Sequence, residues 1–144
     1  MLGKHFLRLF GSGRLPPDSV RLVEADPSGF IAESLVCSIT FRNVRAPGKY
    51  FWRRRQWFLG ALAVTQKRVV AYRNRKCLVN VPWDDPRVRQ IKFSVPYPGC
   101  LSLAYEASLF QPIWAGSIEI RFTTADAEHA LMAIEAGLRK LCRS

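Results

Sequence analysis

The stretch GALAVTQKRVVAYRNRK, residues 60–76, is the part of the chain that most clearly indicates its fold. It contains five Lys or Arg residues, which alone would be typical of a tract that binds nucleic acid or an anionic membrane. Four apolar or aromatic residues, 69–72, interrupt these charges, and a fully solvated charge run would not contain them. A β-hairpin explains the pattern better, with residues 65–68 in the turn and residues 69–72 in the returning strand.

The chain on either side of this hairpin also has the pattern of β-structure. In its last strands apolar and polar residues alternate, so that one face of each strand is apolar. Such alternation predicts antiparallel strands that cover a core on one side only. The complete pattern predicts seven or eight strands, bounded by turn residues, at positions 19–24, 30–44, 50–65, 68–73, 77–81, 90–95, 101–105 and 118–123.

The C-terminal residues change to a helical period. Thr124 is suited to cap a helix, and cations in the last turn favour the negative end of the helix dipole. Apolar residues recur at steps of four and three and form one stripe, made of Ala127, Leu131, Ile134, Leu138 and Leu141. The predicted fold is therefore mainly β with a C-terminal α-helix.

Length and composition predict one folded domain, residues 18–144, after a short helical or flexible segment, residues 1–17. That segment is expected to dock on the domain, with contact to a membrane surface or a partner as the alternative. No run of eighteen apolar residues predicts a transmembrane helix. Because Arg8 interrupts the apolar N-terminus and no cleavage site follows, no signal peptide is expected. We expect a cytoplasmic protein, with a peripheral position at the membrane as an open possibility.

The sequence carries no pattern of catalytic or metal-binding residues. Its two histidines, His5 and His129, stand apart from any nucleophile motif, and the adjacent pair Asp84-Asp85 is typical of a turn. The four cysteines lack a CxxC pair; reduced thiols are expected, with disulfides as the alternative: Cys37, Cys77, Cys100 and Cys142. We therefore expect no enzymatic activity, no metal site and no cofactor.

Two segments carry a resemblance to a known fold. They are LGALAVTQKRVVAYRNRKCLVNVPWDDPRVRQIKF, residues 59–93, and GSIEIRFTTADAEHALMAIEAGL, residues 116–138. Their order of apolar strand, Thr-x-x-Arg, second strand, Pro-containing turn and final strand before a helix resembles the pleckstrin-homology-like (PH-like) superfold, and within it the bacterial PH and GRAM-like domains. The resemblance implies a strongly bent antiparallel sheet or partly open barrel, closed at one end by the C-terminal helix. It also implies a binding or scaffolding role, and Pro86 departs from the pattern, where Ile is usual.

Positive charge is concentrated in the middle of the chain. The formal net charge is +11, and residues 42–92 hold fourteen Lys or Arg against only two carboxylates. Within this region, aromatic rings alternate with arginines in residues 50–58, a composition that suits an anionic membrane surface or single-stranded nucleic acid. The structural alternative is a hairpin with exposed arginines and buried rings. The candidate residues for an anionic partner are Lys49, Trp52, Arg53, Arg54, Arg55, Lys67, Arg68, Arg73, Arg75 and Lys76.

A second candidate is the apolar loop at residues 107–116. Its Pro and Gly predict a loop, although loops normally lie on the surface and are polar. The loop is expected to fold back over the core, with self-association or membrane insertion as alternatives. Its candidate interaction residues are Leu109, Phe110, Ile113 and Trp114.

These features predict a non-enzymatic binding module with a basic face, directed at anionic phospholipid or at a protein partner. A nucleic-acid-associated basic protein is the first alternative, because the same charges would attract phosphate backbones. A homo-oligomeric structural protein that uses the apolar loop is the second.

Overall fold

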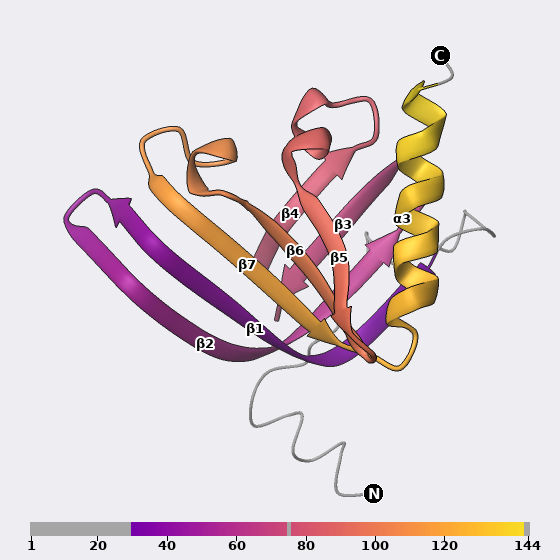
Figure 1. Cartoon of the computed structure of the whole chain (residues 1–144), viewed down its shortest axis with the longest axis horizontal. Coiled ribbons are helices and arrows are strands. Elements are labelled where there is room, and N and C mark those ends of the chain that lie inside the picture. Colours follow the sequence, from indigo (N-terminus) through magenta and orange to yellow (C-terminus); the bar gives the residue numbers. More distant parts are fainter. Residues whose placement is uncertain (1–29, 75, 143–144) are drawn as a thin grey trace, which may run out of the picture.

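The computed structural model describes residues 30–74 and 76–142 (Figure 1). Within them, seven strands form one curled antiparallel sheet: β1 (Phe30–Ala46), β2 (Lys49–Val64), β3 (Arg68–Arg73), β4 (Lys76–Pro82), β5 (Lys92–Tyr97), β6 (Cys100–Glu106) and β7 (Ala115–Thr123). Two short 3-10 helices, η1 (Pro86–Gln90) and η2 (Ala107–Leu109), lie between strands, and the helix α3 (Ala127–Cys142) follows β7. The predicted fold class, a bent antiparallel sheet with one C-terminal helix, is confirmed.

The strand order in the sheet is β4-β3-β2-β1-β7-β6-β5, so β1 joins two antiparallel meanders. The first two strands are also the longest, with 17 and 16 residues. Their pairing continues to Ala46 and Lys49, which leaves Pro47-Gly48 as the turn. As a result, the β1–β2 hairpin extends beyond the strands beside it, at the left of Figure 1.

Two irregularities curve β1. Ser34 has a φ of 57° where the register with β2 shifts, and Asn43 has a φ of 52° where the register with β7 shifts. Extra residues of this kind bend a strand and increase its twist. Gly116 on β7 is fitted to the second bulge, because a Cβ there would collide with the Asn43 carbonyl. The first residues of β7 are thus held closely against β1 of the hairpin.

The core fills the concave face of the sheet. Its largest fully buried side chains come from β2, β6, β7 and α3, among them Leu62, Leu103, Phe122 and Ile134. α3 lies beside one end of the curled sheet and contacts β2, β5 and β6 (Figure 1). Because apolar burial stabilises by about 25 cal/mol per Å², this layer of strand and helix side chains supplies most of the folding free energy.

The turn after β2 has the hydrogen bonds that its sequence predicts. The Thr65 hydroxyl accepts hydrogen bonds from the backbone N–H groups of Lys67 and Arg68, at 3.1 and 3.0 Å. Its own O–H donates to the Arg68 carbonyl at 3.2 Å. Val69 to Tyr72 then return beside β2 as buried residues. The β-hairpin interpretation of the residues 60–76 pattern is therefore confirmed for the part of the stretch that the structure describes.

Trp83 connects three parts of the fold. Its indole N–H donates to the Thr65 carbonyl at 2.8 Å, which ties the β4–η1 connection to the β2–β3 turn. Its ring lies against α3 at Gly137, where a Cβ would collide with the indole. Trp83 is buried, so the glycine makes room for a ring that closes the end of the sheet.

The departure from the family pattern at Pro86 has a local explanation. Pro86 is the first residue of η1, a position where its missing N–H is not needed. The Asp85 carboxylate accepts from the Arg87 backbone N–H at 2.9 Å and pairs with the Arg87 guanidinium at 2.7 Å. These contacts lower the pKa of Asp85. The predicted turn is thus a capped 3-10 helix.

Some predictions fall on residues that the structure does not describe. These are the helix at 2–10, the strand at 19–24, the boundary between residues 17 and 18, and Arg75. Among the described residues, Cys37, Cys77 and Cys100 carry free thiols, in agreement with the expected reduced state. Burial raises the pKa of Cys37 to about 12, which keeps this thiol protonated and unreactive.

Candidate functional site

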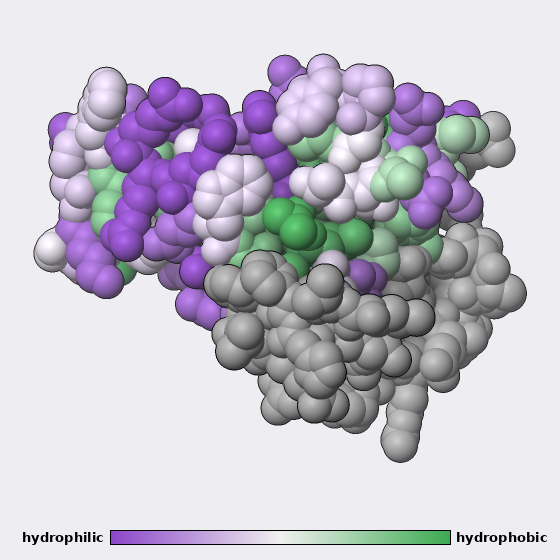
Figure 2. Space-filling model, turned by 90° about the horizontal axis from the view of Figure 1, so that it is seen from below, coloured by the Kyte–Doolittle hydropathy of each residue, from purple (hydrophilic) through white to green (hydrophobic). Residues whose placement is uncertain are grey.

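The charged residues at the far end of the β1–β2 hairpin, residues 41–56, are all positive. We call this segment the hairpin end. It contains six exposed cations and no carboxylate: Arg42, Arg45, Lys49, Arg53, Arg54 and Arg55. Hydrophilic residues predominate in the corresponding left part of the surface in Figure 2, with some hydrophobic ones among them. A projecting element whose charges are all positive attracts anions over roughly a Debye length, about 10 Å at 0.1 M salt.

Strand pairing gathers three of these arginines on the convex face of the sheet. Arg42 lies directly opposite Arg53, and Thr40 lies opposite Arg55. The Arg55 Nε–H donates to the Thr40 hydroxyl at 3.2 Å, which orients the guanidinium on this face. Like charges placed directly opposite each other destabilise a sheet. The arrangement is therefore unfavourable for folding alone and favourable for binding an anion.

A single carboxylate on β7 compensates part of this charge. Glu119 lies 3.4 Å from Arg42 and 3.2 Å from Arg121, and it accepts a hydrogen bond from Ser102 at 3.0 Å. Partial burial acts to raise the pKa of Glu119, but the Ser102 hydrogen bond and the two guanidinium charges outweigh it and hold the pKa below its ordinary value. Among described residues, no carboxylate pairs in this way with Arg53 or Arg55.

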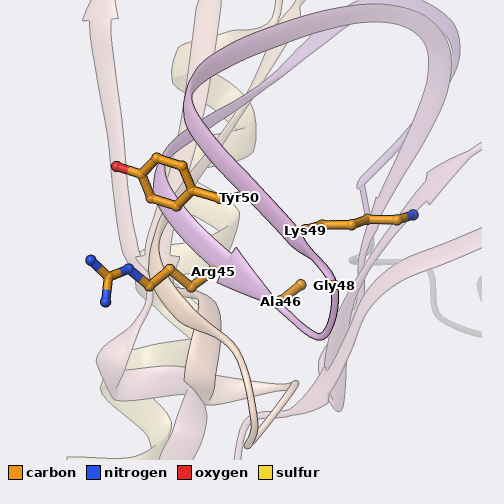
Figure 3. Close-up of a pocket in the computed structure, with 5 residues that line it drawn as sticks. All are labelled: Arg45, Ala46, Gly48, Lys49 and Tyr50. Carbon is orange, nitrogen blue, oxygen red and sulfur yellow. The ribbon is translucent and has the colours of Figure 1, made fainter.

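The turn of the hairpin is open rather than pocket-like. Figure 3 shows that Arg45 and Tyr50 point to one side of the hairpin and Lys49 to the other. The Arg45 guanidinium lies 5.7 Å from the centre of the Tyr50 ring, a cation–π contact. A hollow of about 590 Å³ lies at this turn, and its two cations, Arg45 and Lys49, point away from each other. It suits an extended anionic surface better than one enclosed phosphate.

Exposed aromatic rings accompany the cations. Trp52 is 73% exposed and Tyr50 is 55% exposed at the hairpin end, and Trp57 is 63% exposed next to it on β2. Large aromatic side chains this exposed add nothing to the core. Trp and Tyr are favoured at the headgroup level of membranes, where the ring is apolar and its N–H or O–H remains solvated.

The structure places nine of the ten predicted anion-site residues, all but Arg75, and divides them among several places. Lys49, Trp52, Arg53 and Arg55 belong to the hairpin end, but Arg54 lies on its concave side, with its guanidinium 5.0 Å from the Phe51 ring centre. Arg73 donates to Gln56 at 2.9 Å and lies 5.2 Å from the Phe58 ring centre. Lys76 begins β4 directly opposite Arg73, whereas Lys67 and Arg68 lie at the other end of the β2–β3 hairpin, at its turn. The described residues therefore do not converge on one face.

The apolar loop between β6 and β7 is largely folded back. Leu109, Phe110 and Trp114 are half-buried and pack against the core, and Phe110 makes an edge-to-face contact with Tyr105 at 5.2 Å. Ile113 is the exception, since 75% of it is exposed. The expected folding back thus accounts for three of the four loop residues, and leaves Ile113 available for contacts.

Two hairpin-end cations, Arg42 and Arg45, were absent from the predicted set. Their signal is the hairpin turn itself: counting outward from Pro47-Gly48 places Arg42 opposite Arg53. Because β1 ends in an ordinary strand pattern, its arginines do not form a run and are inconspicuous in the sequence. Only the register with β2 brings them together.

Glu119→Gln is expected to reduce stability while strengthening the positive field of the hairpin. Removing the charge leaves the buried Nε of Arg121 beside a neutral amide, so a loss of about 1 kcal/mol in unfolding free energy is expected. Because the pKa of Glu119 is lowered in the folded state, its stabilisation is present above pH 4.5 and is lost as the pH falls below it. Urea unfolding of both forms at neutral and acid pH measures this. An undiminished difference at low pH would contradict the assigned ion pairs.

Comparison with known proteins adds no further constraint. No protein-family model matches the chain, and no curated protein matches its sequence. Over the described ranges, no three His, Cys, Asp or Glu side chains are grouped so as to hold a metal ion. None of the helices in these ranges combines the length and hydrophobicity needed to cross a bilayer.

Proposed function

We propose that the chain is a non-enzymatic, PH-like binding module whose hairpin end contacts anionic phospholipid surfaces. Seven antiparallel strands followed by one C-terminal helix is the arrangement that the resemblance to the PH-like superfold implies. Fold alone does not determine function, so the proposal depends on the hairpin end.

The observation that carries the proposal is the excess of positive charge at the hairpin end, of which Glu119 compensates only the part at Arg42. Six cations project there without a carboxylate in the same segment, and two of them, Arg42 and Arg53, face each other across the strands. Near an anionic membrane each Lys or Arg contributes about 1 kcal/mol, and Trp52 adds a ring suited to the interface. The diverging directions of Arg45 and Lys49 favour a surface over a single headgroup (Figure 3).

Binding of single-stranded nucleic acid is the rival function. Bases stack on exposed rings and arginines contact phosphates, and the exposed Trp57 beside Arg55 offers both groups on the convex face. The hairpin end favours the membrane instead, because its exposed rings and cations are carried by a hairpin that projects beyond the neighbouring strands (Figure 1).

Co-sedimentation with vesicles tests the proposed function. The chain should pellet with phosphatidylserine-containing vesicles at low salt, should remain in solution with pure phosphatidylcholine vesicles, and should be released as salt rises toward about 1 M, where the Debye length is about 3 Å. Failure to pellet with anionic vesicles at low salt would refute the proposal. Salt-steep binding to a single-stranded oligonucleotide together with that failure would support the rival.

A further inference from the structure

Ile113 stands at the apex of a tight, uncharged turn. The Trp114 backbone N–H donates to the Gln111 carbonyl at 2.8 Å, so residues 111–114 form a turn with Pro112 and Ile113 at its centre. Pro suits its position, but Ile does not, because such positions favour Gly, Asn, Asp or Ser. The exposed Ile113 side chain is therefore not explained by turn chemistry, and the core does not use it.

The segments on both sides hold this turn in place. On one side Phe110 contacts Tyr105, and the Arg87 guanidinium lies 5.2 Å from the centre of the Phe110 ring. On the other side Trp114 packs against the core, and β7 begins at Ala115. An exposed apolar side chain with anchored neighbours loses little conformational freedom when it enters a new environment.

The turn lies at the same end of the sheet as the hairpin end. Arg45 pairs with Tyr50 of β2 on one side and with Ala115 of β7 on the other. Since neighbouring strands are about 4.8 Å apart, the backbones of Tyr50 and Ala115 are separated by only about 10 Å. Figure 1 shows the β6–β7 loop and the β1–β2 turn together at the left of the molecule.

From this juxtaposition we propose that Ile113 inserts into the bilayer interface while the hairpin end contacts the anionic headgroups. This inference rests on the proposed function and adds a second, apolar element from a different loop. Trp52 and Tyr50 lie at the headgroup level, and the segment 107–116 has no charged residue of its own that would have to be desolvated at the acyl boundary. The two elements together fix the orientation of the domain, with the left end of Figure 1 toward the membrane.

A matched pair of substitutions separates insertion from general surface hydrophobicity. Ile113→Ser should weaken binding to phosphatidylserine-containing vesicles about tenfold at about 0.15 M salt, equivalent to about 1.4 kcal/mol. Met132→Ser is the control, because Met132 is similarly exposed (66%) but lies on α3. It should change binding less than twofold. Equal effects of the two substitutions, or none from Ile113→Ser, would overturn the inference.

A spectroscopic experiment tests the same inference without a substitution. With isoleucine δ1-methyl labelling, phospholipids that carry a spin label on the acyl chain should broaden the Ile113 methyl signal more strongly than the signals of the core isoleucines. These core residues are Ile39, Ile91, Ile118, Ile120 and Ile134. If the chain binds the vesicles but the Ile113 signal is unaffected, insertion is refuted and the proposed function survives. If the chain does not bind anionic vesicles at any salt, both are refuted.

Discussion

Replacing Arg53 and Arg55 together by glutamine is expected to weaken binding to phosphatidylserine-containing vesicles about 30-fold. Each cation near an anionic membrane contributes about 1 kcal/mol, and a loss of about 2 kcal/mol corresponds to that factor. These two arginines are chosen because no carboxylate of the described residues pairs with them, whereas Arg42 is already partly compensated by Glu119. Vesicle co-sedimentation at low salt gives the affinity.

The control for this variant removes the same charge from elsewhere. Lys67→Gln with Arg139→Gln lowers the net charge equally, but Lys67 lies in the β2–β3 turn and Arg139 lies on α3. It should bind almost as well as the unchanged chain. Equal losses in the two variants would mean that net charge, rather than the hairpin end, drives binding.

The variant with Arg53→Gln and Arg55→Gln should lose less than about 1 kcal/mol of unfolding free energy relative to the unchanged chain. Losing the Arg55 hydrogen bond to Thr40 costs about 1 kcal/mol, while relieving the repulsion between Arg42 and Arg53 returns about 0.2–1 kcal/mol. Thermal unfolding therefore distinguishes a lost binding surface from a lost fold. A large drop in Tm would show that these arginines serve the fold.

Gly137→Ala is expected to destabilise the fold by about 1–2 kcal/mol, opposite to the effect of helix propensity. In an unobstructed helix this change stabilises by up to about 1 kcal/mol. Here the new Cβ would collide with the buried Trp83 ring, and overpacking of this kind costs about 1–3 kcal/mol. At about 4 °C per kcal/mol, a fall of about 4–8 °C in Tm is expected.

Two further variants make the cause of this loss testable. In a Trp83→Leu background the collision is relieved, so Gly137→Ala should become neutral or stabilising, a coupling that a double-mutant cycle measures. Ala136→Gly, at the adjacent exposed position, should cost only about 1 kcal/mol through propensity. If Gly137→Ala stabilises the unchanged chain, then the Trp83 ring does not pack against α3 at Gly137 as described.

Local sequence patterns predicted the strands and the helix because their causes are local. Alternation in β5, β6 and β7, the Thr65 turn and the 4-3-4-3 stripe of α3 each depend on residues a few positions apart. The bulges at Ser34 and Asn43 were not predictable, because neither residue is unusual in its sequence context. They depend on the register that β1 adopts with β2 and with β7, which no local pattern contains.

The candidate site depended more on distant contacts. The run Arg53-Arg54-Arg55 reads as one cluster, yet alternation along β2 places Arg54 on the opposite face. Arg42 joins the others only through the register across the hairpin, and Ile113 reaches the same end only because β7 pairs with β1. Sequence therefore identified the charged region, while pairing across the sheet defined the surface.

The most direct test of the proposed function is a residue-level map of the membrane-bound surface. Backbone amide NMR spectra of the 15N-labelled chain would be compared with phosphatidylserine-containing and with pure phosphatidylcholine nanodiscs. Signals of the hairpin end, residues 41–56, and of Ile113 should broaden or shift only with the anionic nanodiscs. Perturbations centred instead on the β2–β3 turn or on α3, or spread evenly over all exposed cations, would contradict the proposed surface.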